Sequence, residues 1–411
     1  MKVINIALPL AAGRRAMVFA LFFMFATISA SAQSLRPDAF PPVEGTLSPK
    51  ALTMATTLEE MDRWNRYPTY DVYTAMMQRF VERYPNLCRV DTIGVSIQGR
   101  LILCLAITGS SDNDLYRPEF FYSSTMHGDE LTGFYLMLRL CDTLLGSYGT
   151  SQQITSLLDR TRIYINPLSN PDGTYYGGDS TVALARRYNA DSVDLNRNYP
   201  DPFGTPPLDS LQPENKAMIA YVERHNFLLS ANLHGGSEVM NYPWDSFTSY
   251  ERPHPQAEWW KAVSKRYVDT CRRYNSRIFT NVNSQGFIAG GDWYVIYNGR
   301  QDYFNYYHHT YELTMEVSTS KKLPTEQLQR YWNIQSHSLI NYIKEVFNAP
   351  ADQPEGIAPH VEADCRVYPN PTRGWVTVET PQGSRNINLS NRPAGVYIIP
   401  VEGHPVKITK L

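Results

Sequence analysis

Two short segments of the chain hold the side chains best suited to bind a metal ion. His127 and Glu130 lie three residues apart in STMHGDELTG, and His234 ends the apolar run FLLSANLH, where two glycines follow it. Two imidazoles and one carboxylate suit Zn²⁺, and three protein ligands leave a fourth position open for water, as catalytic zinc requires. Each fragment alone is weak evidence, because a histidine with a glutamate three residues later also occurs by chance. Together they predict a catalytic site with one Zn²⁺ per chain.

Both segments follow strand-like runs, which alternate with helix-like runs along the chain and predict an α/β fold. The predicted strands are EFFYSST, RIYINP, FLLSANLH and YELTMEVS. An apolar stripe from Leu131 to Leu145 predicts a helix directly after the first of them. In an open α/β sheet, ligands bind beyond the carboxyl ends of the strands. Because each run ends in or beside polar residues, we expect the site at that edge.

Further motifs add a family resemblance. The segments ALARRYNADSVDLNRNYPD and GGDWYVIYNGRQDYFNYYHHTYELTMEVS occur together with HGDE and with NPDG at 170–173. Across roughly residues 65–345 the chain resembles the zinc metallocarboxypeptidases of the carboxypeptidase A/B type, and most closely the N/E subgroup, which lacks a long activation segment. The resemblance implies a mixed twisted sheet flanked by helices on both faces. It makes His127, Glu130 and His234 the zinc ligands.

The resemblance also implies which residues carry out peptide hydrolysis. Glu316, in TMEVS, matches the family's catalytic glutamate. A carboxylate beside the metal can take a proton from water and return it to the leaving amine. Arg187 matches the arginine that polarises the scissile carbonyl and stabilises the oxyanion, which suits a permanently charged guanidinium. Arg186 is the neighbouring alternative, but the spacing back from DLNRN favours Arg187.

Three further matches concern the substrate, which the resemblance identifies as the C-terminus of a peptide or protein. Asn196 and Arg197 match the pair that binds the terminal carboxylate, where the planar guanidinium can bind both carboxylate oxygens. Tyr294, in DWYVIYNGRQD, matches the mobile tyrosine that closes over the substrate. These roles predict an exopeptidase.

The preferred C-terminal residue is predicted from Asp245, which ends NYPWD and matches the aspartate that pairs with a substrate Lys or Arg in the N/E subgroup. Gln301 and Gly290 match other positions of the same pocket. Basic specificity is therefore the hypothesis. Arg300 departs from the subgroup, which commonly has an apolar residue there, and a cation near the pocket could repel basic substrates or neutralise Asp245.

Two other functions stay open at this point. A murein-peptide carboxypeptidase acting on diamino-acid-containing cell-wall stems would use the same fold, and Arg197 and Asp245 are equally compatible with that substrate. A non-catalytic surface binding protein that kept the fold is the other alternative. The presence of all three zinc ligands together with Glu316 argues against it.

Composition and the N-terminal segment bear on partners and localisation. The 38 Lys+Arg and 40 Asp+Glu give a formal net charge of -2, which provides no general attraction to nucleic acid. The five cysteines have no metal-like spacing and no readable pairing. Residues 1–32 combine early basic residues, an apolar run and Ala-Ser-Ala before Gln33, which predicts a secretory signal peptide. No later stretch is apolar enough to cross a bilayer, so we expect an exported mature chain with no transmembrane span.

The remaining organisation is predicted from composition shifts. An N-terminal extension covers 33–64, the catalytic domain 65–348, and a linker rich in Pro and Ala 349–364. Alternating residues around Asn-Pro and Gly turns predict a short β tail at 365–411. That tail resembles the C-terminal sorting domain of type IX secretion, in a shortened form, which implies contact with that machinery and release or surface display through the periplasm. An ordinary small β domain is the alternative.

Overall fold

The structure, a computed structural model, describes residues 52–109, 117–350, 366–368, 372–380, 383–391, 395–401 and 404–410. The predicted signal peptide and all but the first two residues of the predicted linker lie outside this part of the chain. The chain divides into two compact units, residues 1–354 and 355–411, and each is described by itself.

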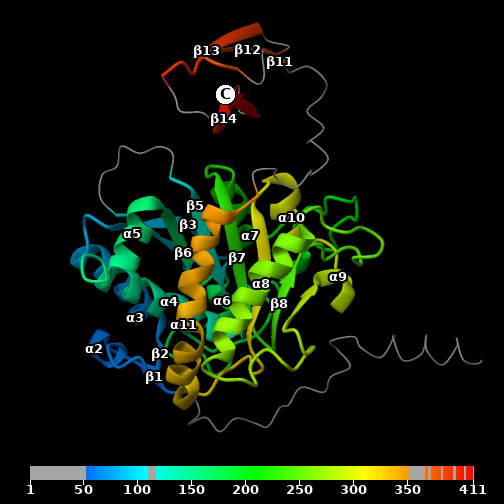
Figure 1. The fold of residues 1–411 in the computed structure, drawn as a ribbon. Coiled ribbons are helices and arrows are strands. Elements are labelled where there is room, and N and C mark those ends of the chain that lie inside the picture. The colour runs from blue at the N-terminus through cyan, green and yellow to red at the C-terminus, as the bar shows by residue number, and fades with distance from the viewer. Residues whose placement is uncertain are drawn as a thin grey trace, which may run out of the picture. The chain divides into compact units, whose positions relative to one another are not determined.

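The first unit is built around an eight-stranded mixed sheet with the order β3-β4-β6-β5-β7-β10-β8-β9 (Figure 1). The strands are β3 (Cys88–Val95), β4 (Leu101–Ile107), β5 (Glu119–Ser124), β6 (Arg162–Asn166), β7 (Phe227–His234), β8 (Ser237–Tyr242), β9 (Phe287–Ala289) and β10 (Tyr311–Ser318). Strands β6, β5, β7 and β10 are neighbours and run parallel. These four strands are the ones predicted from the sequence, so that prediction is confirmed. Their carboxyl ends lie at the same edge of the sheet.

Helices cover both faces of the sheet, as predicted (Figure 1). The helices are α3 (Tyr70–Arg83), α4 (Leu131–Gly146), α5 (Gln152–Arg160), α6 (Pro171–Thr174), α7 (Pro213–Val222), α8 (Ala257–Arg272), α9 (Gly290–Trp293), α10 (Arg300–Tyr307) and α11 (Leu328–Lys344), with 3₁₀ turns η3 (Leu195–Arg197), η4 (Thr325–Gln327) and η5 (Glu345–Asn348). Successive side chains of a strand point to opposite faces. Phe120 and Tyr122 of β5 therefore pack with α4 and α11, whereas Phe121 packs with α7 and α10.

The described part of the predicted N-terminal extension packs into the first unit. Strand β1 (Met54–Ala55) pairs in parallel with β2 (Tyr67–Pro68), and Ala55 is fully buried. This segment also contains the four-residue helix α2 (Leu58–Met61), where the hydroxyl of Thr57 accepts a hydrogen bond from the Glu60 amide. The helix ends there because the chain turns at Trp64 through a positive φ of 53°.

The second unit has antiparallel strands, as the alternating pattern predicted. Strands β11 (Arg366–Tyr368), β12 (Trp375–Thr380) and β13 (Gly383–Asn388) form one sheet, and β14 (Gly395–Val401) pairs with β15 (His404–Lys410). Among the described residues of the whole chain, no helix combines the length and the apolar character needed to span a bilayer. The four described cysteines, Cys88, Cys104, Cys141 and Cys271, are buried free thiols.

Candidate metal centre

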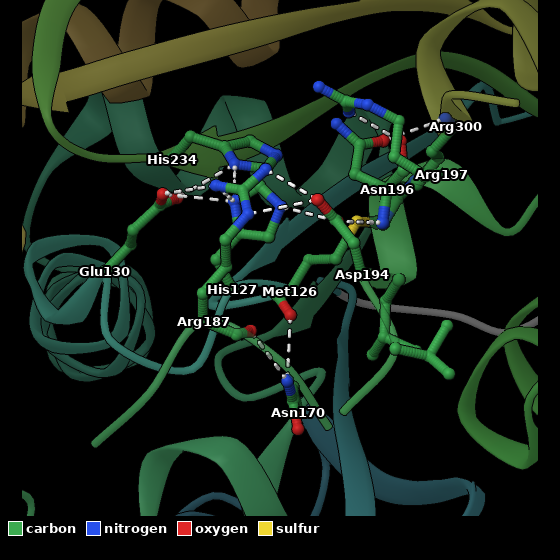
Figure 2. Close-up of polar contacts among 12 residues, drawn as sticks. Met126, His127, Glu130, Asn170, Arg187, Asp194, Asn196, Arg197, His234 and Arg300 are labelled. Atoms are coloured by element: carbon green, nitrogen blue, oxygen red, sulfur yellow. Dashed lines mark hydrogen bonds and ion pairs between the residues drawn. The ribbon is translucent and has the colours of Figure 1, made fainter. Parts of the chain in front are cut away.

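Three side chains converge at the carboxyl edge of the central strands. Nδ1 of His127 lies 3.0 Å from Oε1 of Glu130 and 3.0 Å from Nδ1 of His234, and Nδ1 of His234 lies 2.9 Å from Oε2 of Glu130. All three residues are buried, and Figure 2 shows their polar ends pointing toward one another. Tetrahedral Zn²⁺ with bonds of about 2.0–2.1 Å keeps its ligand atoms roughly 3.3 Å apart. The spacing of the three donors therefore fits one zinc ion.

Two elements position these ligands. His234 is the last residue of β7, and His127 and Glu130 lie in the turn between β5 and α4, where the Glu130 amide donates to the carbonyl of His127 at 3.1 Å. Since α4 begins at Leu131, His127 and Glu130 are brought together by this turn and not by the face of a helix. Gly128 permits the turn, because a Cβ there would lie 2.4 Å from the backbone of Gly173.

The partners of His127 determine which of its nitrogens can bind a metal. Nε2 lies 3.1 Å from a carboxylate oxygen of Asp194, which can only accept, so Nε2 carries the proton. Nδ1 faces a guanidinium nitrogen of Arg187 at 3.1 Å, which can only donate, so Nδ1 presents a lone pair toward the cluster. His127 is thus held in the tautomer that a metal ligand requires.

The charges of the cluster favour the metal-binding protonation states. Burial lowers the pKa of His234 to about 4, which keeps its imidazole neutral. Burial alone would raise the pKa of Glu130, but His127, His234 and Lys321 hold it well below its usual range. A neutral imidazole and an ionised carboxylate are the forms that bind Zn²⁺. The residues present therefore fit zinc in chemistry as well as in spacing.

Glu316 lies beside this cluster. It is the cross-strand neighbour of His234 in the parallel pairing of β10 with β7. Its side chain is 8% exposed, and its Oε2 has no hydrogen-bond partner. Burial, and then repulsion from Glu130, raise the pKa of Glu316 to about 8. A carboxyl group with one unpartnered oxygen next to a metal cluster, and with a pKa of about 8, can exchange a proton with a reacting molecule.

The structure separates the two neighbouring arginines. Arg187 binds Asp194 through two nitrogens, at 3.0 and 2.8 Å, and its third nitrogen faces His127 (Figure 2). Arg186 turns away, stacks on the ring of Tyr176 and donates to two backbone carbonyls. Arg187 is therefore the arginine at the metal cluster, as the spacing favoured.

The residues predicted to bind the substrate carboxylate are close to the same edge. Asn196 and Arg197 belong to η3, whose first turn is capped by Asp194. Asn196 accepts a hydrogen bond from the backbone amide of Arg300 at 3.0 Å. The pKa of Tyr294 is raised by burial and then by the charge of Glu316, and the charges of Arg197 and Asp245 also act on it. Tyr294 is thus within electrostatic range of both the metal cluster and Asp245, while its role remains a prediction.

Asp245, Gln301 and Gly290 form a second buried group. Asp245 is 2% exposed, and its Oδ1 accepts from the side chain of Gln301 at 2.8 Å. A Cβ on Gly290 would lie 1.9 Å from that oxygen, so only glycine leaves room for the carboxylate. Burial, followed by repulsion from Asp302, raises the pKa of Asp245 well above its usual range. Among the described residues, none of the ion pairs includes Asp245.

Arg300 does not act on Asp245 as the sequence suggested it could. Its guanidinium is fully buried, forms an ion pair with Glu312 at 2.8 Å and lies over the rings of Phe121 and Phe304. The sheet-facing side of α10 therefore holds Arg300, whereas the next residue, Gln301, contacts Asp245. Of the two effects that the sequence left open for Arg300, neutralisation of Asp245 is not what the contacts show, because Arg300 is paired with the buried Glu312.

Sequence reasoning missed two charged residues of the centre. Asp194 is the first residue of DLNRNYPD, and it joins Arg187 to His127. Lys321 follows β10 and places its ammonium 3.3 Å from Oε1 of Glu130. Asp194 could have been found from the sequence, because it is an acidic residue in the motif that also contains Asn196 and Arg197. Lys321 had no comparable signal, since its approach depends on the loop after β10.

The parallel strands of this α/β sheet bring two histidines and a glutamate together beside the buried carboxyl group of Glu316, an arrangement that fits a metal-dependent hydrolase. The sequence model of the zinc carboxypeptidase family matches residues 73–338. The chain belongs to this family, and His127, Glu130 and His234 are the residues that fit its zinc ion.

Sequence relatives agree with this assignment. The chain is 32% identical over 294 residues to carboxypeptidase D of Rattus norvegicus, a match that covers 69% of this chain and 21% of that protein. It is 34% identical over 305 residues to carboxypeptidase M of Mus musculus, covering 68% and 66%. With the catalytic chain of carboxypeptidase N of Homo sapiens it shares 33% over 320 residues, covering 68% and 69%. The chain thus spans about a fifth of carboxypeptidase D and about two thirds of the other two relatives.

Solved structures share the fold. The crystal structure of thrombin activatable fibrinolysis inhibitor superposes with a TM-score of 0.61 at 18% identity, covering 75% of this chain and 79% of that one. The carboxypeptidase A from Helicoverpa armigera gives 0.60 at 18% identity, covering 70% and 76%. At this level of identity the likeness concerns the fold alone.

The contacts of Asp194 predict that it orients His127 for zinc. Replacing Asp194 with Asn removes the charge that holds the Nε2 proton of His127 and that pairs with Arg187. We expect zinc affinity, measured by competition with a chromophoric chelator, to fall about 10–100-fold. Asp191→Asn, an exposed position three residues earlier, is the control and should bind zinc like the wild type. Equal affinities of Asp194→Asn and wild type would show that Asp194 does not act on the metal site.

Proposed function

We propose that the protein is an exported zinc carboxypeptidase that hydrolyses the C-terminal peptide bond of peptides or proteins and prefers C-terminal lysine or arginine. Family membership supports the reaction class. The observation that carries the preference is the buried carboxylate of Asp245, which has an amide partner in Gln301 but no ion pair.

Zinc, when bound, supplies a Lewis acid that polarises a carbonyl oxygen and makes water a better nucleophile. Glu316 would take the proton of the attacking water and deliver it to the nitrogen of the departing amino acid. Its raised pKa, about 8, is suited to a group that both accepts and returns a proton near neutral pH. Burial beside His234 limits the water that competes for this proton.

Positively charged groups would orient the substrate. Arg187 directs one guanidinium nitrogen toward the ligand cluster, where it can stabilise negative charge on the carbonyl oxygen. Arg197, with Asn196, would bind the terminal carboxylate and so exclude internal peptide bonds. Tyr294, whose pKa is raised by burial and by the charges of Glu316 and Asp245, would close over the bound C-terminal residue.

The preference for a basic side chain follows from the cost of burying charge. A buried carboxylate without a counter-ion is unfavourable, and its raised pKa reflects that cost. A lysine or arginine side chain of the substrate would supply the missing cation, whereas a leucine or phenylalanine would leave the carboxyl group unpaired. A diamino acid at the end of a murein stem offers the same ammonium group to Asp245. Peptide and murein substrates therefore differ only in the part of the molecule that lies outside this pocket.

Replacing Glu316 with Gln keeps the shape of the side chain but removes its ability to carry a proton. We expect turnover to fall on the order of 10²–10⁴-fold while zinc content stays near one per chain. Peptidase rates and metal analysis on the same sample measure the two effects. Glu258→Gln, at a glutamate of α8 whose side chain is 88% exposed, is the control. Wild-type turnover in Glu316→Gln would remove this residue from the mechanism.

Replacing Asp245 with Ala should abolish the preference for a basic C-terminal residue. The ratio of kcat/KM for C-terminal Arg over Leu is expected to fall roughly 10²-fold or more, because burying an unpaired cation costs about 3–5 kcal/mol. Dipeptides that differ only in their last residue, together with a diamino-acid stem peptide, measure the ratio and separate peptide from murein substrates. Asp269→Ala, on the surface of α8, serves as the control. An unchanged ratio in Asp245→Ala would refute the assignment.

Export is proposed from residues 1–32 and from the resemblance of residues 365–411 to a type IX sorting domain. Mass spectrometry of the culture medium and cell envelope is expected to find a mature chain that begins at Gln33 and lacks the tail. Peptides from residues 1–32 on the exported protein would contradict the signal peptide. An extracellular protein with an intact tail would contradict a cleaved sorting signal.

A further inference from the structure

A chain of buried polar contacts runs from α10 across the sheet to a zinc ligand. A guanidinium nitrogen of Arg300 donates to the hydroxyl of Ser123 at 2.5 Å, and this hydroxyl lies 3.1 Å from one end of the side-chain amide of Asn232. The other end of the Asn232 amide lies 2.7 Å from Nε2 of His234. The contacts connect helix α10 with strands β5 and β7 through side chains of residues that are at most 2% exposed.

The outer end of this chain is firmly anchored. Arg300 pairs with Glu312 at 2.8 Å, and Glu312 accepts a further hydrogen bond from Ser230 at 2.7 Å. The guanidinium also lies between aromatic rings, 5.2 Å from the ring centre of Phe121. A buried guanidinium with a single buried counter-ion has little freedom to move, because any displacement leaves a charge unpaired. Arg300 therefore holds the Ser123 hydroxyl in place.

The chemistry of the two middle groups suits a metal ligand. Nδ1 of His234 faces Glu130 and His127, so Nε2 is the nitrogen left for an outer hydrogen bond. A carboxamide has a donor at one end and an acceptor at the other, and a hydroxyl both donates and accepts. The hydroxyl of Ser123 can accept a hydrogen bond from Arg300 and can also accept one from the amide of Asn232. With Nδ1 as the zinc ligand, Nε2 of His234 carries the proton, so the amide of Asn232 must present its oxygen to Nε2 and its NH2 group to Ser123. The hydroxyl oxygen of Ser123 then accepts hydrogen bonds from both Asn232 and Arg300.

We propose that Arg300 is a positioning residue for the zinc ligand His234, acting through Ser123 and Asn232. Outer hydrogen bonds fix the orientation of a ligating histidine, and removing them typically lowers metal affinity about 10–100-fold. His127 receives such support from Asp194. The Arg300 chain provides the equivalent support for the second histidine and gives a role to the residue that departs from the family pattern.

The test measures zinc affinity in Ser123→Ala and Ser124→Ala. The two serines are neighbours on β5 and equally buried, and each loses one buried hydroxyl. The hydroxyl of Ser124 points to the other face of the sheet and donates to the carbonyl of Pro167 at 2.6 Å, so it is the matched control. Ser123→Ala leaves the pair of Arg300 with Glu312 intact. Each protein is stripped with a chelator and titrated with Zn²⁺ against a chromophoric competitor, and its melting temperature is measured without metal.

We expect Ser123→Ala to bind Zn²⁺ at least tenfold more weakly than the wild type, with Ser124→Ala close to the wild type and with similar melting temperatures for the two variants. Wild-type affinity in Ser123→Ala, or an equal loss in Ser124→Ala, would overturn the inference. A wild type that binds no zinc would instead contradict the zinc site itself, so the two failures are distinguishable.

A second variant decides the question if Ser123→Ala does not fold. Replacing Arg300 with Met and Glu312 with Leu together removes the anchor without leaving either charge unpaired, a change that buried ion pairs often tolerate. The double variant is expected to lose zinc affinity at least tenfold while retaining a cooperative melting transition. Wild-type affinity in this folded variant would show that the anchor does not act on His234.

Discussion

The structure depends on the close approach of three electron-pair donors in a buried place. Two imidazole nitrogens and two carboxylate oxygens within about 3 Å of one another would repel if nothing positive lay among them. Burial makes this repulsion stronger, because little water is present to screen it. A divalent cation resolves it, and the surrounding groups are arranged accordingly: Arg187 and Lys321 bring positive charge to the rim, and burial lowers the pKa of His234, which favours its neutral imidazole. The sheet makes the approach possible, since parallel neighbours β5 and β7 end at the same edge and deliver their ligands side by side.

Outside the cluster, Arg187 and Arg300 are each held by a buried or partly buried carboxylate. Asp194 binds both Arg187 and His127, so the position of the arginine and the tautomer of the histidine are set by one carboxylate. Glu316 and Asp245 are different. Both are buried, both have raised pKa values, and neither forms an ion pair among the described residues. In the proposed function, the partner of each carboxyl group arrives with the substrate: a proton for Glu316 and a cationic side chain for Asp245.

The fold and the ligand set could be predicted from the sequence because both rest on local patterns. Four strand runs were correct to within a residue, and the ligands lie directly at or after two of them. What could not be predicted depended on contacts between distant segments. The turn from His127 to Glu130 looked like the start of a helix, since the spacing is the same in both. Arg300 looked like a cation near Asp245, because its neighbour Gln301 belongs there. Consecutive helical residues point in different directions, and only the position of Glu312 on β10 shows which way Arg300 turns.

The first turn of α10 links the parts of the site. The backbone amide of Arg300 holds Asn196, its side chain reaches Ser123, and Gln301 contacts both Asp245 and the backbone of Thr314. Asp302 then accepts hydrogen bonds from the backbone amides of Asp245 and Ser246. Three successive residues therefore contact Asn196, which is proposed to bind the substrate carboxylate, Ser123, which is proposed to support the zinc ligand His234, and Asp245, which is proposed to select the substrate side chain. A shift of this turn would disturb all three at once, which gives a physical reason for the otherwise costly burial of an arginine: its ion pair with Glu312 ties the turn to the central strand that also carries Glu316.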